Sequence, residues 1–303
     1  MIKIDIFINK KYMQNSTMNM LKPRKSGLIS PEEAQRQLAA YEPPTDDGDN
    51  EGPGARKPKS KRTKARASAS SLADFIELHD IECVDADRTV FEQYDTICVP
   101  KDILCGADGK QMNFTPHAAA VYCESNGLFL PSFALSCNIV AALFAGRPNP
   151  DIERVLQQYK DKGTGTGWHV QNTVIDYGAA HVIHYPTAAD FSKNDAINGN
   201  CSRTALGFSK SALENSLLEA ALQDADHARF VRQLTGLRDP SVLVEVGTYF
   251  GKPAKLWFPW IGKNGANYSG KRAAWLGCSN NNFFINTGNN LDNNNAARGV
   301  RRR

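Results

Sequence analysis

The 303-residue sequence predicts an α+β domain of short antiparallel strands and several helices, preceded by a disordered N-terminal segment. Two observations lead to this prediction. Stretches with helix start signals alternate with short strand-like runs, and the first 70 residues differ in composition from the rest. The hydrophobic fraction of 41% and the charged fraction of 22% are those of a globular chain.

No apolar run approaches the roughly 18 residues of a membrane span, so we expect no transmembrane segment. The N-terminal MIKIDIFINKK is too interrupted by charge to form the apolar core of a secretory signal. A virion-associated and a cytoplasmic location are both compatible with the sequence.

Residues 1–70 combine an acidic block with a basic one. Pro, Gly, Asp and Glu dominate between Tyr41 and Gly54, and the run Arg56–Arg66 then holds seven Lys or Arg and no acid. Such a segment cannot bury enough apolar area to offset the entropy lost on ordering. We therefore expect residues 1–70 to be disordered. An electrostatic tether to a partner or an RNA is the functional alternative for the charged blocks.

The net charge of +4 is local to the basic run. Without its seven members, 29 basic residues stand against 32 acidic ones, which leaves a net charge of −3. A nucleic-acid binder presents a basic folded surface, so this balance argues against nucleic acid as a partner.

Ordered structure is expected from about Ser71, with an apolar start at Leu72 and a strand over residues 90–99. Thr115 followed by Pro116 is an N-cap with proline at the first helical position. These residues predict a helix over 117–125, which Asn126-Gly127 terminates.

Two further helices are expected in the middle of the chain. Ser132 begins a helix over 133–144 that is apolar nearly all round and should therefore be buried. Residues 151–160 form an amphipathic helix. The glycine-rich Gly163–Gly167 that follows is no phosphate loop, because no Lys-Ser/Thr comes after it.

The sequence of the second half of the domain predicts two hairpins with one helix between them. The predicted elements are a hairpin over 173–185, a helix from the capping box Ser211-x-x-Glu214 to about Leu234, and a hairpin formed by 241–249 and 255–259.

The C-terminus is the most informative stretch. Nine of the sixteen positions from Asn280 to Asn295 are asparagine, interleaved with apolar residues of core type. Asparagine is a poor helix and strand former, and a disordered tail would lack the apolar anchors Trp275, Phe283 or Phe284, and Ile285. The pattern predicts a contiguous binding face of exposed amides on a rigid scaffold: Asn280, Asn281, Asn282, Asn286, Asn289, Asn290, Asn293, Asn294 and Asn295.

Two segments carry a resemblance to a known family. The segment Ala274–Arg301, AWLGCSNNNFFINTGNNLDNNNAARGVR, resembles the variable region of target proteins of diversity-generating retroelements. The segment Thr115–Ser132, TPHAAAVYCESNGLFLPS, is similar to the helix, Gly, Leu-Pro-Ser/Thr, helix signature of C-type lectin folds of the formylglycine-generating-enzyme type. The resemblance covers about residues 71–303 and implies a C-type lectin-like domain there.

The resemblance also implies a function. In this family an error-prone reverse transcriptase scrambles the adenines of a template RNA, and the product replaces the 3′ end of the target gene. Asparagine codons are adenine-rich, so unscrambled sites encode asparagine. The implied function is a ligand-binding display protein with a variable region over about 274–301. Its partners would be a variable protein or surface ligand, including a host-cell receptor.

Two other functions are compatible with the sequence. One is a phage tail or surface adhesion component whose asparagine-rich end is fixed. The other is an enzyme of the formylglycine-generating type, but the related oxidase uses a close cysteine pair, whereas Cys278 has no neighbour in sequence nearer than Cys201. Thiol oxidation requires a paired or metal-bound thiolate, so we expect no catalytic residue.

We also expect no cofactor and no metal. The Glu-Pro-Asn and Trp-Asn-Asp tripeptides of calcium-dependent lectins are absent, and Asp292-Asn293 cannot supply the about six to eight oxygens that calcium binds. The seven cysteines contain no CxxC pair, which zinc sites use. A few free buried thiols are expected instead among the seven cysteines, Cys83, Cys98, Cys105, Cys123, Cys137, Cys201 and Cys278.

The remaining candidate residues are interpreted structurally. On a strand, His181 and His184 would point to opposite faces and could not bind one ion. A Cys137–His169 nucleophile pair is disfavoured because Cys137 lies within the apolar helix. Trp257–Trp260 is expected to be core rather than a sugar platform, and Arg301–Arg303 to be a solvated charged tail.

Overall fold

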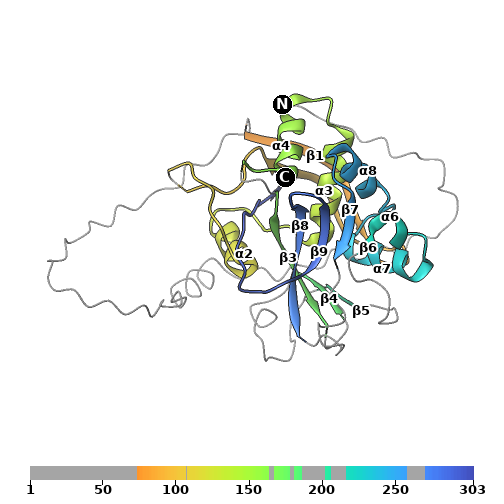
Figure 1. Cartoon of the computed structure of the whole chain (residues 1–303). Helices are drawn as coiled ribbons and strands as arrows, with labels where there is room; N and C mark the ends of the chain where they lie inside the picture. The colour runs from red at the N-terminus through yellow and green to blue at the C-terminus, as the bar shows by residue number, and fades with distance from the viewer. Residues whose placement is uncertain are drawn as a thin grey trace, which may run out of the picture.

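Figure 1 shows the computed structural model of the chain. The structure describes residues 74–106, 108–163, 167–177, 181–185, 202–205, 216–257 and 270–303. The prediction for residues 1–70 lies outside them. The elements in chain order are β1 Phe75–Val84, β2 Val90–Pro100, α2 Pro116–Ser125, α3 Phe133–Ala145, α4 Pro150–Lys160, β3 His169–Asp176, β4 His181–His184, β5 Ser202–Ala205, β6 Ser216–Leu217, α6 Leu218–Ala221, α7 Ala225–Thr235, α8 Val242–Tyr249, β7 Ala254–Trp257, β8 Lys271–Cys278, β9 Phe283–Asn289 and β10 Arg301–Arg302.

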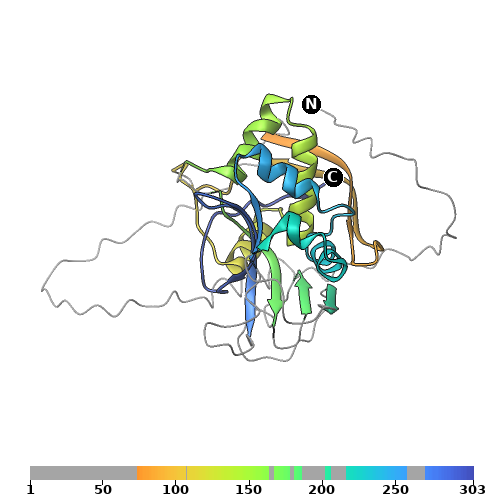
Figure 2. The ribbon, with the colours of Figure 1, turned by 45° about the vertical axis from the view of Figure 1, so that its right-hand side comes forward.

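The strands form two sheets. The smaller has the order β1-β2-β10, so the last strand of the chain pairs with the first hairpin of the domain. The larger has the order β5-β4-β3-β8-β9-β7-β6, in which only β7 and β9 are parallel neighbours. Figure 2 shows β3, β4 and β5 of this sheet side by side. The predicted α+β class, with mostly antiparallel strands, is confirmed.

The helix starts follow the sequence signals. Thr115 Oγ1 accepts a hydrogen bond from Ala118 N at 3.3 Å at the start of α2. Ser132 Oγ accepts one from Leu135 N at 3.0 Å at the start of α3. The amphipathic helix predicted over 151–160 is α4, which begins one residue earlier. The hairpin predicted over 173–185 is formed by β3 and β4.

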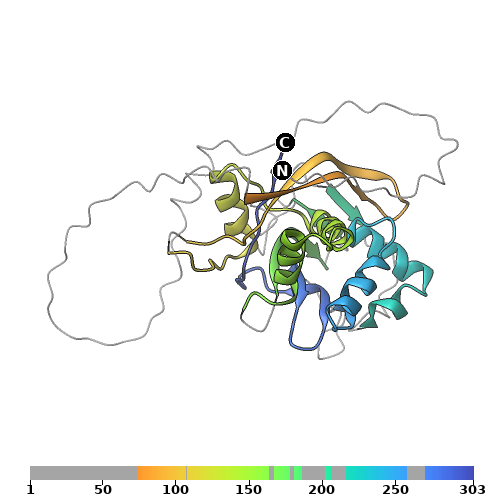
Figure 3. The ribbon, with the colours of Figure 1, turned by 90° about the horizontal axis from the view of Figure 1, so that it is seen from above.

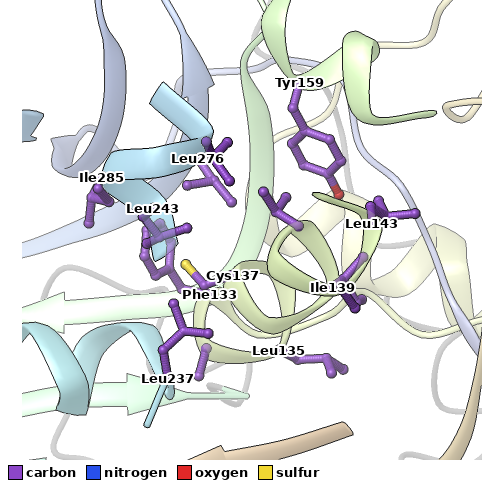
Figure 4. Close-up of a cluster of buried hydrophobic side chains, with 14 of the residues drawn as sticks. Phe133, Leu135, Cys137, Ile139, Leu143, Tyr159, Leu237, Leu243, Leu276 and Ile285 are labelled. Carbon is purple, nitrogen blue, oxygen red and sulfur yellow. The ribbon is translucent and has the colours of Figure 1, made fainter. Parts of the chain in front are cut away.

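Helix α3 is the centre of the main core. Figure 3, from above, shows it surrounded by α4, the α7–α8 side and the β1–β2 hairpin. Its side chains meet residues from α8, β8 and β9, such as Leu243, Leu276 and Ile285 (Figure 4). The predicted burial of this apolar helix is confirmed, because Phe133 and Cys137 are fully buried.

Two predicted elements are wrong. Residues 242–249 form helix α8 and not a strand, because the buried Leu243, Val246 and Phe250 recur at helical spacing although the segment is rich in valine. The helix predicted from 211 to about 234 is divided into α6 and α7 by a turn after Ala221, where Asp224 caps α7. Ser211 and Glu214 themselves lie outside the described residues.

The prediction of a solvated charged tail at Arg301–Arg303 is also wrong. Arg301 and Arg302 form β10, registered against Cys98 and Ile97 of β2. The Arg301 guanidinium lies 4.6 Å from the centre of the Phe75 ring, and Arg303 forms an ion pair with Glu77. The expected solvated tail is therefore the edge strand of a sheet. Among the described residues no helix is long and apolar enough to cross a membrane.

Candidate binding face

The side chains of strand β9 alternate between a buried side and a half-buried side of the sheet. Phe283, Ile285 and Thr287 are fully buried and face the α3 side, whereas Phe284 and Asn286 between them are half-buried on the other side. We call this second side, across β7, β9 and β8, the outer face. Its residues on β9 are held by a strand whose inner side chains anchor it to the main core.

The structure describes all nine asparagines of the predicted face, and none is buried. Five are exposed and lie in connections: Asn280, Asn281, Asn290, Asn293 and Asn294. Four are half-buried: Asn282, Asn286, Asn289 and Asn295. Of the apolar anchors, Trp275, Phe283 and Ile285 are buried and Phe284 is half-buried.

The exposed amides form two groups rather than one contiguous patch. Asn280 and Asn281 lie in the β8–β9 turn, which is closed by a hydrogen bond from Ser279 N to Asn282 O of 3.0 Å. Asn290, Asn293 and Asn294 lie in the loop after β9. Because each strand residue advances by about 3.4 Å, the two ends of the seven-residue β9 are about 20 Å apart. The half-buried outer face of the sheet lies between them.

An aromatic stack occupies this part of the outer face. The rings of Trp168 and Phe284 stack with centroids 5.6 Å apart and planes inclined by 20°. Trp275 lies against Trp168 at 6.3 Å and is 6% exposed. It belongs to a second hydrophobic cluster with residues of α2 and Ala297, on the opposite side of the sheet from α3. Together, the nine asparagines, Trp168 and Phe284 are called the asparagine face below.

Two glycines allow Trp168 to reach this position. Gly277 of β8 has a φ of 146°, and a Cβ atom there would lie 2.1 Å from the Gly167 carbonyl oxygen. The backbone before Trp168 therefore crosses directly over Gly277, and Gly167 N donates to Cys278 O at 2.9 Å. A Cβ on Gly167 would likewise lie 1.9 Å from Tyr159 O. Any side chain at either position would displace the tryptophan.

Lys162 borders the stack on its other side. Its Nζ donates to Trp168 O at 2.7 Å and to Asn295 Oδ1 at 2.6 Å. Partial burial lowers the pKa of this ammonium to about 8. Asn295 Oδ1 also accepts from Ala296 N at 2.8 Å. Asn295 therefore holds the backbone in place, and Asn286 does so too, through a 2.8 Å bond from Gly288 N to its Oδ1.

Sequence reasoning missed Lys162, Trp168 and Gly277. Trp168 follows the glycine-rich stretch Gly163–Gly167, from which the sequence predicts no site. Nothing local links it to Phe284, more than a hundred residues later. A glycine within an otherwise apolar strand is the one available signal, since such a residue often marks close approach by another backbone.

The thiols do not present a reactive site. Cys278 is fully buried within the main core, on the opposite side of β8 from the outer face, and burial raises its pKa to about 12. Its thiol is therefore protonated at neutral pH. Burial also raises the pKa of Cys137 well above its usual value and lowers that of His169 well below it. All six described cysteines are free, and Cys105 alone of them is exposed.

The other candidates have structural positions. His184 is buried and shares a 2.9 Å hydrogen bond with Thr173, whereas His181, on the other face of β4, is half-buried. Trp257 is half-buried, and Phe258–Trp260 lie outside the described residues. The described residues contain no group of three or more metal-binding side chains. No protein-family model, curated protein or solved structure matches this chain.

Proposed function

We propose that this chain is a ligand-binding display protein whose asparagine-rich C-terminal face is diversified by retroelement mutagenesis. One observation carries the proposal. Along β9 the inner side chains Phe283, Ile285 and Thr287 are fully buried, while none of the nine asparagines is. Substitution of the asparagines can therefore change the surface while the core stays the same.

We further propose that residues 71–303 adopt a C-type lectin-like fold of the formylglycine-generating-enzyme type. Two features favour this proposal. Helix α2 is followed by Leu130-Pro131 and then by the buried helix α3, in the order of the family signature. The last strand, β10, pairs with the first hairpin of the domain, so that both ends of the domain lie in one sheet.

The proposed activity is recognition and not catalysis. Asparagine amides donate and accept hydrogen bonds but do not titrate near neutral pH. The thiol nearest in sequence to the asparagines, Cys278, is buried and protonated. We expect Cys278→Ala to leave ligand binding unchanged. Loss of binding or of a thiol-dependent activity in this variant would favour the enzyme alternative.

The gene itself tests the proposal. We expect a near-identical non-coding repeat of the 3′ end of the gene close by, differing from it only where the repeat has adenine. The differences should fall in codons of the nine asparagines. Absence of a repeat, or differences that ignore adenine, would favour the fixed tail or surface component instead.

A display experiment tests the protein. A yeast-display library would randomise the five exposed positions Asn280, Asn281, Asn290, Asn293 and Asn294, with ovalbumin as the probe. We expect folded binders from this library. A matched library at Phe283, Ile285 and Thr287 should yield few folded proteins. Failure of the first library to fold would contradict the proposal, as would binders whose affinity does not depend on the randomised positions.

A further inference from the structure

The strands of the asparagine face come from a stretch without acidic residues. From Val246 to Leu291, 46 residues include no Asp or Glu. The same stretch contains five basic residues, Lys252, Lys255, Lys263, Lys271 and Arg272. Outside this stretch and the run Arg56–Arg66, the chain has a net charge of −8. Strands β7, β8 and β9 therefore come from a positively charged stretch, and the acid that follows it, Asp292, is exposed in the loop after β9.

The second contributing segment is also free of acids. Residues 162–175 include no Asp or Glu and supply both Lys162 and Trp168. The half-buried Lys162 ammonium donates to two neutral oxygens and has no ion pair among the described residues. Asp161, the acid before it in sequence, is exposed, and its charge offsets part of the effect of burial on the pKa of Lys162. Partial burial of a cation is unfavourable unless an anion compensates it, and the third N–H of Lys162 can bond one.

A second lysine lies at the other side of the aromatic stack. Lys255 of β7 is registered against Phe284 of β9, and its neighbours Ala254 and Leu256 are buried on the inner side. Lys255 therefore lies on the outer face beside Phe284. Figure 1 shows β7 and β9 side by side. Lys252 lies at the β8–β9 turn, where its Nζ donates to Ser279 O at 2.7 Å. Neither lysine has an ion pair in the described part of the chain.

We propose that the asparagine face binds acidic segments of partner proteins. Carboxylates of the partner would bond Lys162 and Lys255, its peptide groups would bond the asparagine amides, and an apolar side chain would cover the Trp168–Phe284 stack. The proposal rests on the proposed function, since it assumes that this face binds ligands. It narrows the ligands to one chemical class by charge complementarity.

A protein partner fits better than a nucleic acid. Single-stranded nucleic acids are bound by aromatic rings that stand open for stacking with bases, along a continuous positive groove. Here Trp168 and Phe284 stack on each other. Asparagine amides, in contrast, match the donor and acceptor pattern of peptide groups.

A titration with matched peptides tests this inference. The probes are dye-labelled 20-residue peptides of alternating Glu and Ser, or of Gln and Ser, followed by fluorescence anisotropy. The full chain is used with the seven basic residues of Arg56–Arg66 replaced by glutamine, because that run would attract acids by itself. We expect the Glu peptide to bind at least about tenfold more tightly than the Gln peptide, and more weakly as salt is added.

Three charge-removing variants localise the binding. Lys162→Gln keeps a hydrogen-bonding side chain and should weaken binding of the Glu peptide about tenfold. Lys255→Gln, which loses no hydrogen bond found in the structure, should weaken it about threefold. The matched control is Arg229→Gln on α7, which removes the same charge from an ion pair with Asp87 and should change nothing.

Several results would overturn the inference. These are equal affinity for the two peptides, no binding at about 1 mM peptide, or insensitivity to both lysine changes. Tighter binding of a labelled 20-residue oligothymidine than of the Glu peptide would favour nucleic acid instead. If the display library still yields binders without any preference for acids, the proposed function stands and only this inference fails.

Discussion

The stretch Asn280–Asn294 and the nine residues that follow it are both rich in polar side chains, but they differ in burial. In the first stretch no asparagine is buried. In the second, residues 295–303, all five residues from Ala296 to Val300 are buried, including Arg298 at 2% exposure. We call residues 295–303 the C-terminal segment.

Backbone pairing explains the burial of the C-terminal segment. Asn295 and Phe114 exchange two hydrogen bonds, of 2.8 and 3.0 Å, and Val300 and Phe129 exchange two of 2.8 Å. Between them, Val170 N donates to Ala296 O at 2.9 Å. The segment is thus enclosed by three distant parts of the chain before it joins β2. These backbone hydrogen bonds fix the position at which the loop after β9 ends.

Arg298 shows how a charged residue is accommodated there. Its guanidinium donates to Pro100 O and to Gln158 Oε1, and it lies 5.9 Å from the centre of the Tyr159 ring. Arg302, the penultimate residue, instead lies over the rings of Tyr94 and Phe129 and donates to Tyr94 Oη at 3.1 Å. The comparison predicts large effects in the fixed parts of the molecule and small ones at the exposed asparagines.

The largest effect is expected at Trp275. Trp275→Ala should lower the free energy of unfolding by about 3–5 kcal/mol, because a large buried ring leaves a cavity. Phe284→Ala, on the same face but half-buried, should lower it by less than about 2 kcal/mol. Urea denaturation measures both. Similar losses from the two changes would remove the distinction between anchor and display residue.

The second-largest effect is expected from acid, which should lower the free energy of unfolding through the buried histidines. Burial lowers the pKa of His184 to about 4, whereas a histidine in the unfolded chain titrates near 6.5. The unfolded chain then binds more protons, so stability should fall by about 3 kcal/mol from this group as pH drops from about 6.5 to about 4. His169 should add to the loss in the same direction.

The variant His184→Gln tests the assignment of that pH dependence. It removes one of the two buried histidines and should reduce the dependence of the urea midpoint on pH between about 6.5 and 4, leaving the contribution of His169. The asparagines do not titrate and should contribute nothing in this window. A wild-type midpoint that stays constant over this range would contradict the prediction.

The buried Arg298 and the exposed Arg302 should also differ in how much they stabilise the fold. Arg298→Ala leaves buried oxygens without donors and should lower the free energy of unfolding by about 2–3 kcal/mol. Arg302→Ala removes an exposed side chain and should lower it by less than about 1 kcal/mol. Thermal and urea unfolding of the two variants provide the comparison. Equal effects would mean that the burial of residues 296–300 does not stabilise the fold.

The smallest effects are expected at the exposed asparagines. Replacing Asn280, Asn281, Asn290, Asn293 and Asn294 together by serine should change the free energy of unfolding by no more than about 0.5 kcal/mol for each position. Asn295→Ala is the matched control within the same set. It removes the acceptor of Lys162 and Ala296 N and should lower stability by about 1 kcal/mol. Calorimetry would show whether Asn295 behaves like the other five.

Much of the fold could be predicted from the sequence where local signals decide it. The caps Thr115 and Ser132 set the starts of α2 and α3, and the apolar run after Ser132 marked the buried helix. The valine-rich 242–249 was wrongly predicted as a strand, because a short apolar run does not distinguish helix from strand. There the contact of Leu243 and Val246 with the core decided the outcome.

For the candidate face, the sequence by itself determined that the asparagines stay out of the core and that Trp275, Ile285 and one of two phenylalanines anchor it. The cost of burying amides without partners needs only the residue types, whereas the choice of Phe283 over Phe284 as the buried ring came from the pairing of β9 in the structure. The tertiary structure alone decided that Trp168 crosses Gly277, that Lys162 and Lys255 lie on either side of the aromatic stack, and that Arg298 is buried. These contacts join residues far apart in the chain, and their geometry is set only when the whole domain has closed around α3.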